Sequence, residues 1–222
     1  MRTAWRTLDP TVARNVVTIA AAALVVGLSF GAIAVASGLP AWAAITMSLL
    51  VFAGGSQFMA VGMLAAGNPF AAVLGGLLLN ARHLPFGLAV ADAVGRSRAE
   101  RLVGSHLLID ESAAFAMAEE SPAERRSVYW FTGGLLFLSW NTGTVLGVLL
   151  GSAAGDPATL GLDAAFPAGL LALILPSLRD PATRRAAIAG AALAVLATPF
   201  LPAGLPVLLA LLGVVLALGV TS

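Results

Sequence analysis

Four short polar stretches interrupt an otherwise apolar sequence, and their side chains can hold a small charged solute or carry a proton. Residues 15–81 contain no Asp, Glu, Lys or Arg, so polar groups in this region are conspicuous. The residues in question are Gly54, Gly55, Ser56 and Gln57; Asn80, Arg82 and His83; His106, Asp110 and Glu111; and Trp140 with Asn141. Their amide, hydroxyl, guanidinium, imidazole and carboxyl groups provide donors, acceptors and charges. Each stretch is therefore a candidate functional site.

The first stretch predicts a broken helix. Adjacent Gly54 and Gly55 each cost about 1 kcal/mol relative to alanine in a helix interior. In a bilayer, non-helical backbone is tolerated only where protein or a water-filled cavity satisfies it. The ends of two half-helices expose amide and carbonyl groups that suit an amino acid zwitterion, and Ser56 and Gln57 add further polar groups. The alternative is that the glycines and Ser56 only allow close helix packing.

The second stretch places an arginine inside an apolar segment. An arginine at the bilayer centre costs about 2.5 to 3.5 kcal/mol on insertion scales, so Arg82 is expected to face a protein interior or a partner. Asn80, Arg82 and His83 are accordingly predicted to bind substrate. Alternatively, Arg82 extends to an aqueous boundary and His83 is an ordinary core residue with a satisfied ring.

The third stretch predicts proton coupling. His106 and Asp110 are four residues apart and would pair on one helix face, whereas Glu111 points about 100° away. A carboxyl group in a low dielectric can exchange protons near neutral pH. The alternative is an interfacial helix whose acidic residues lie in water.

The fourth stretch lies in the middle of an apolar segment. Trp140 and Asn141 carry an indole donor and an amide and are predicted to line a pathway, whereas Trp130 is expected to be an interface anchor. No metal site or cofactor site is predicted, because the chain has no cysteine and no nucleotide-binding Walker motif.

The elements that position these stretches are predicted to be membrane helices. Mean hydropathy is +0.95, 59% of the residues are hydrophobic and 10% are charged, far from the roughly one quarter charged in soluble proteins. The fold class predicted is an all-α polytopic membrane protein, one integral domain over residues 1–222, with about seven or eight transmembrane helices. The predicted helices are 16–37, 42–66, 70–91, 103–119, 128–152, 162–178, 186–200 and 203–220.

The arginines predict the orientation, with one inconsistency. Arg2, Arg6 and Arg14 precede the first apolar segment, which is too long for a secretory signal core and is read as a spanning helix. They place the N-terminus in the cytoplasm. If every predicted helix spans, however, Arg96, Arg98 and Arg101 lie outside. Either a segment before residue 92 is re-entrant, or this loop is tolerated because acidic residues lie nearby.

A weak internal similarity indicates an inverted three-helix repeat. Residues 49–57 resemble residues 135–143 in hydropathy and in small polar residues at mid-helix. A unit of three helices would place its two copies in opposite orientations, as in many secondary transporters. The predicted halves are about 42–119 and 128–200.

The same stretches, in this order and spacing, resemble the AzlC family of branched-chain amino acid permeases. The resemblance covers almost the whole chain, and its most specific part is the Gly-Gly-Ser-Gln block followed by Asn80-Ala-Arg82-His83. The matching residues are Phe30-Gly31, Met47 to Phe58, Asn80 to His83, Asp110-Glu111, Trp140, Gly147, Gly151 and Leu160 to Asp163. One departure is Ile109, where the family motif commonly has threonine, and this leaves the substrate range open.

The resemblance implies a bacterial inner-membrane exporter of valine, leucine and isoleucine, with methionine or toxic analogues such as azaleucine as further substrates, working with a small AzlD-like membrane subunit. A secondary, proton-coupled carrier fits the residues, and the main alternative is a passive channel for small solutes. An intramembrane hydrolase is disfavoured because Phe58 breaks the usual Gly-x-Ser-x-Gly pattern. A purely structural subunit is disfavoured because buried ionisable residues are costly to retain without a task. No enzyme activity and no nucleic acid partner are expected.

Overall fold

The computed structural model describes residues 8–154, 171, 175, 177–201, 205–210 and 212–219, and these residues form helices and turns without a β-strand. Two of the described helices are long and apolar enough to cross a membrane, α1 (Pro10–Ala36) and α9 (Pro122–Ala154). At 1.5 Å per residue they measure about 40 and 50 Å. The all-helical class is confirmed, while the predicted count of seven or eight crossings stays a prediction.

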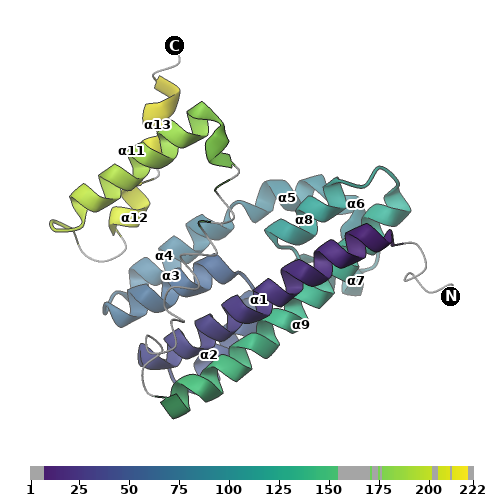
Figure 1. Cartoon of the computed structure of the whole chain (residues 1–222), viewed down its shortest axis with the longest axis horizontal. Helices are drawn as coiled ribbons and strands as arrows, with labels where there is room; N and C mark the ends of the chain where they lie inside the picture. Colours follow the sequence, from purple (N-terminus) through teal and green to yellow (C-terminus); the bar gives the residue numbers. More distant parts are fainter. Residues whose placement is uncertain are drawn as a thin grey trace.

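Helices α1 and α9 lie side by side and run in the same direction (Figure 1). Helix α1 begins where the Asp9 carboxylate accepts a hydrogen bond from the Thr11 amide (2.6 Å), with Pro10 in the first turn. A Cβ atom built on Gly27 would lie 2.5 Å from the Trp140 carbonyl oxygen, and one on Gly151 would lie 2.9 Å from the Ala32 Cα atom. Glycines therefore bring the two backbones into direct contact along the pair.

The predicted helix 42–66 is broken, as expected, into α2 (Ala41–Val51) and α3 (Gly54–Ala65). The break falls at Phe52, whose φ of 41° is left-handed, and at Ala53. Helix α2 runs antiparallel to α9, since Ser48 bonds Asn141 and the Phe52 ring contacts the Phe137 ring.

Helix α3 turns back after the break. Its first residue, Gly54, lies against the ring of Trp140, and Phe58 reaches the Phe30 ring farther along α1. Helices α2 and α3 therefore form a hairpin, whereas the sequence predicts one broken helix that crosses the membrane once. Helix α4 (Pro69–Asn80) packs beside α3 and leads toward the other end of the bundle (Figure 1). The chain continues there through α5 (His83–Ala89) and α6 (Ala91–Val94).

A second broken helix replaces the predicted helix 103–119. It consists of α7 (Arg98–His106) and α8 (Asp110–Met117), separated by residues 107–109. Helix α7 follows the direction of α9, because Tyr129 Oη donates to the Gly104 carbonyl (2.7 Å) and Leu107 lies against Gly133. Helix α8 returns, and its Ala116 carbonyl accepts from Arg125 Nε at 3.3 Å. The two parts again form a hairpin.

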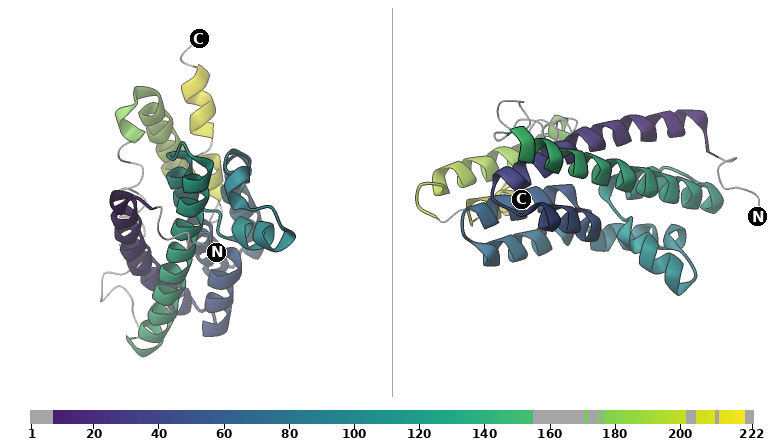
Figure 2. Two further views of the ribbon diagram at one scale, coloured as in Figure 1. Left: turned by 90° about the vertical axis from the view of Figure 1, so that its right-hand side faces the viewer. Right: turned by 90° about the horizontal axis from the view of Figure 1, so that it is seen from below.

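The C-terminal part forms a separate group of helices beside the α1–α9 bundle (Figures 1 and 2). It contains a short 3-10 helix η3 (Ser177–Arg179), α11 (Pro181–Ala197), α12 (Leu205–Leu209) and α13 (Leu212–Gly219). Helix α11 starts five residues before the predicted helix 186–200, because the Asp180 carboxylate caps the Thr183 amide (2.7 Å). Most of the predicted helix 162–178, with Leu160 to Asp163, lies outside the described residues.

Candidate functional site

The start of α3 is a helix N-terminus that lies inside the bundle and lacks a capping side chain at its N-cap position. Its N-cap residue, Ala53, provides no side-chain cap, so the first-turn amides of Gly54 and Gly55 have no acceptor among the described residues. Gln57 is fully buried, and its Oε1 atom accepts from the Ala53 amide at 3.0 Å. Ser56 Oγ donates to the Ala53 carbonyl at 2.9 Å. The break is thus held in shape by two of the four predicted residues.

Trp140 covers this terminus. A Cβ atom at Gly54 would lie 2.9 Å from Cη2 of the Trp140 ring, so only glycine fits without a shift. The indole stacks on Phe30 with ring centroids 5.8 Å apart, and Phe58 meets it edge-on at 6.3 Å. The α3 terminus therefore lies against an aromatic wall.

The side chain of Asn141, next to Trp140, forms hydrogen bonds away from the start of α3. Its Nδ2 donates to the Phe137 carbonyl (2.8 Å), and its Oδ1 accepts from Ser48 Oγ (2.8 Å). Ser48 also lies 3.1 Å from Thr144 Oγ1. These bonds join α2 to α9. Ser48 was not predicted as a site residue, although a lone serine four positions before the break was a signal for such a contact.

The end of α4 lies beside the start of α3, since a Cβ atom on Gly55 would meet Leu79 Cδ2 at 3.4 Å. The next residue is Asn80. Beyond it, Arg82 Nη2 lies 3.1 Å from Asp110 Oδ2, and His83 Nε2 lies 3.6 Å from Asp110 Oδ1. The Arg82 and Asp110 side chains are 44% and 41% exposed, so this ion pair lies at the edge of the bundle rather than in its core.

The predicted pairing of His106 with Asp110 is wrong. The four-residue spacing pairs side chains only within one helix, and the helix is interrupted at residues 107–109. Ser112 Oγ holds this break by accepting from the Ile109 amide (3.0 Å) and donating to the Leu107 carbonyl (2.9 Å). His106 Nε2 instead lies 2.8 Å from the Leu49 carbonyl oxygen.

Asp110 and Glu111 open helix α8. Both carboxylates lie in its first turn, where the helix dipole favours negative charge. Glu111 is half-buried and forms no ion pair among the described residues. The structure therefore brings Asp110, but not His106, to Arg82 and His83.

Buried polar atoms without a partner concentrate in the predicted residues. Among the described residues, five side-chain atoms are buried without a hydrogen bond: Gln57 Nε2, Asn80 Oδ1, Asp110 Oδ1, Thr132 Oγ1 and Trp140 Nε1. Four of them belong to candidate site residues. Of these, Asp110 Oδ1 lies 3.6 Å from His83 Nε2, within ion-pair distance. A buried group without a hydrogen bond costs about 1–3 kcal/mol, so each of these atoms calls for an explanation, and a role in binding is one. Two of these atoms are N–H donors, Gln57 Nε2 and Trp140 Nε1; Gln57 lies near the start of α3, and the Trp140 ring contacts Gly54.

Comparison with known proteins identifies the family of the chain. Residues 18–154, from α1 to the end of α9, match the family model described as AzlC protein. The chain belongs to the AzlC family. This confirms the resemblance stated from the sequence, and the matched region contains every candidate site residue.

Several relatives match most of the chain. The branched-chain amino acid transport protein AzlC of Bacillus subtilis (strain 168) is 29% identical over 198 residues, which cover 86% of this chain and 77% of that protein. An uncharacterized membrane protein of Helicobacter pylori (strain ATCC 700392 / 26695) is 28% identical, covering 88% of this chain and 86% of that protein. The inner membrane protein YgaZ of Escherichia coli (strain K12) is 30% identical, covering 69% and 62%. No solved structure matches the chain.

Proposed function

We propose that this AzlC-family protein exports branched-chain amino acids (valine, leucine and isoleucine), and methionine as a further substrate, across the bacterial inner membrane as a secondary, proton-coupled carrier. The name of the Bacillus subtilis relative supports the substrate class, and the name of the Escherichia coli relative supports the inner membrane. The chain would work with a small AzlD-like membrane subunit, and its N-terminus would lie in the cytoplasm.

The observation that carries the proposal is the group of unpaired buried polar atoms around the start of α3. A substrate carboxylate fits the free amides of Gly54 and Gly55, because the N-terminus of a helix favours negative charge. Gln57 Nε2 and Trp140 Nε1 would donate to the same carboxylate, and Asn80 Oδ1 would accept from the substrate ammonium.

The apolar side chain of the substrate would lie against the aromatic wall. Phe58 and Trp140 present ring surfaces next to the α3 terminus, and Met59 lies between α3 and α4 against Gly75. Flexible and aromatic side chains of this kind accommodate branched aliphatic groups without discriminating sharply between them. The site therefore supports a class of apolar amino acids rather than one member.

The ion pair of Arg82 and Asp110 would supply the coupling. The substrate ammonium and a proton would compete for the Asp110 carboxylate, which Arg82 holds in place, so a proton that enters from outside would displace the substrate. His83 and Glu111 are the other ionisable groups nearest to this pair and would share the proton. Release of the proton into the cytoplasm would restore the Asp110 carboxylate for the next substrate, so that proton entry is exchanged for substrate export.

Counterflow of labelled leucine in proteoliposomes tests the proposal. The chain is reconstituted alone and with its AzlD-like subunit, with and without a pH gradient. Saturable counterflow that responds to the gradient is expected; non-saturable flux would favour the passive channel, and saturable flux indifferent to pH would remove the proton step.

Two glycine variants in one helix sharpen this test. Gly54→Ala pushes a methyl group against the Trp140 ring and is expected to reduce leucine counterflow at least several-fold. Gly62→Ala is the matched control, because a Cβ atom there meets nothing within 4 Å. Equal counterflow by the two variants would contradict a substrate site at the start of α3.

A further inference from the structure

The two broken helices point in opposite directions along the bundle. The α2–α3 hairpin starts and ends near the C-terminal end of α9, whereas the α7–α8 hairpin starts and ends near its N-terminal end. We propose that α2–α3 and α7–α8 are re-entrant hairpins that enter the membrane from opposite faces and meet tip to tip. In the carrier function proposed above, on which only this last step rests, the joined tips would close the substrate pathway.

The tips are in direct contact. His106, the last residue of α7, lies with Nε2 2.8 Å from the carbonyl oxygen of Leu49, near the end of α2. The rings of His106 and Phe52 are 6.3 Å apart, and both contact Phe137 in the middle of α9, at 5.5 and 5.0 Å. Each hairpin contributes about 8 to 12 residues per arm, which is half the roughly 20 residues of a crossing helix.

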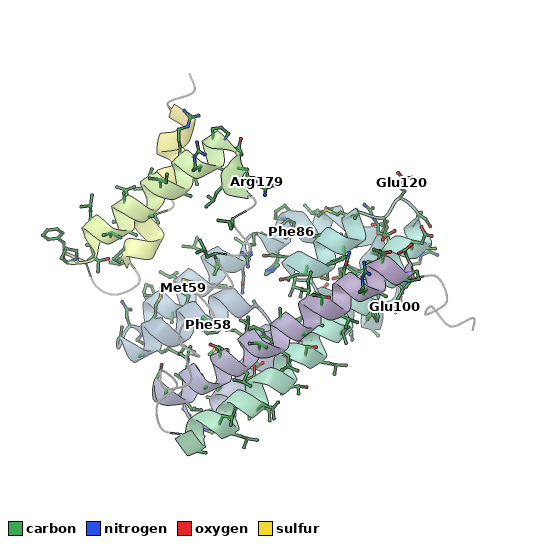
Figure 3. All side chains as sticks on the ribbon, in the orientation of Figure 1. Phe58, Met59, Phe86, Glu100, Glu120 and Arg179 are labelled. Atoms are coloured by element: carbon green, nitrogen blue, oxygen red, sulfur yellow. The ribbon has the colours of Figure 1, made fainter. Side chains whose placement is uncertain are left out.

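Charged residues within residues 8–154 divide the bundle in the same way. One end carries the ion pairs of Arg126 with Glu100 (2.9 Å) and Arg125 with Asp92 (3.4 Å). Glu100 and Glu120 both lie at this end in Figure 3. At the opposite end, residues 36–41, 65–69 and 151–154 contain no charged residue. Such a distribution is expected when one end faces the cytoplasm and the other does not.

Opposed hairpins also remove the inconsistency in the arginine pattern. If α2–α3 returns to the face that it entered, only α4 to α6 cross between α1 and the loop of residues 95–97. That loop then lies on the same side as Arg14, and so do Arg125 and Arg126 after the second hairpin. The parallel direction of α1 and α9 requires an odd number of crossings between them, and one crossing satisfies it.

Cysteine labelling distinguishes this arrangement from three full crossings, because the chain has no cysteine of its own. Four exposed alanines that flank the hairpins are replaced singly: Ala41→Cys and Ala66→Cys, and Ala99→Cys and Ala118→Cys. Each full-length variant is treated with a membrane-impermeant maleimide in spheroplasts and in inverted membrane vesicles. Detergent-solubilised protein, in which all four cysteines react, is the control for reactivity.

The expected result is that Ala41→Cys and Ala66→Cys label only in spheroplasts, and that Ala99→Cys and Ala118→Cys label only in inverted vesicles. Labelling of Ala41→Cys and Ala66→Cys from opposite faces would overturn the proposal, as would opposite faces for the second pair. Leucine counterflow is measured on the same variants. Loss of counterflow with the expected labelling would contradict the carrier function and leave the hairpins standing.

Discussion

Replacing Gly27 by alanine is expected to force α1 and α9 apart. The new Cβ atom would lie 2.5 Å from the Trp140 carbonyl oxygen, and because this oxygen belongs to the backbone no side chain can move aside. A separation of at least 3.0 Å requires the helices to shift by roughly 0.5 Å in a close-packed interface. Overpacking of this kind costs about 1–3 kcal/mol.

Gly134→Ala in α9 is the matched control, since a Cβ atom there meets nothing within 4 Å. Both variants gain the same helix propensity of about 1 kcal/mol, so the overpacking term alone separates them. For a chain of this size, about 1–3 kcal/mol corresponds to a difference in Tm of roughly 2 to 12 °C. The assay is thermal unfolding in detergent, followed by circular dichroism. Equal Tm values for the two variants would refute the close parallel packing of α1 and α9.

Three further predictions concern single interactions. Arg82→Ala and Asp110→Ala should each abolish gradient-driven leucine counterflow. The double variant that exchanges the two residues should restore part of the counterflow. If its counterflow rate is no higher than that of either single variant, the ion pair is not the functional unit. Tyr129→Phe removes the buried hydrogen bond to the Gly104 carbonyl and should destabilise the protein by about 1 kcal/mol in the same unfolding assay, and an unchanged Tm would show that the bond contributes nothing. Hydrogen bonds from the backbone amides of residues 97 and 96 lower the pKa of Glu100 below its ordinary 4.5. The stabilisation by Glu100 is therefore present above pH 4.5 and is lost as the pH falls through the lower pKa of the folded protein. Glu100→Gln should flatten this part of the curve of stability against pH, and an unaltered acid dependence would exclude Glu100 as its source.

The sequence predicted a break at Gly54 to Gln57 because two adjacent glycines weaken a helix. The observed break lies at Phe52 and Ala53, while Gly54 and Gly55 form the first turn of α3. Gly54 is required there by the Trp140 ring rather than by backbone conformation, whereas a Cβ atom at Gly55 would make only an ordinary contact with Leu79. The arginine pattern offered a re-entrant segment before residue 92 as one of two alternatives, but hydropathy does not encode direction and could not place the reversal at this break.

The second break gave no signal in the sequence. Residues 107–109 are Leu-Leu-Ile, without glycine or proline, and the interruption depends on Ser112 bonding back to this segment. The spacing of His106 and Asp110 therefore indicated a pair that does not form. The contact of Arg82 with Asp110 joins different helices, and a single sequence carries no information about such a pairing.

The predicted inverted repeat stays a prediction. Helix α9 is continuous through residues 135–143, whereas residues 49–57 contain the first break, so the two similar segments differ in structure. The breaks that correspond in shape are those of α2–α3 and α7–α8, each followed by a longer segment, α4 to α6 or α9. Similar hydropathy alone could not identify this correspondence.

The affinity of the reconstituted carrier for leucine in a Gln57→Glu variant tests the central claim most directly. Glutamate keeps the oxygen that accepts from the Ala53 amide, so the break is preserved, but it replaces the free Nε2 donor by a second acceptor. Loss of a hydrogen bond to a charged group costs about 1.5–3 kcal/mol, and the half-saturation concentration for leucine counterflow should therefore rise roughly ten-fold or more. An unchanged half-saturation concentration in a folded variant would contradict substrate binding at the start of α3.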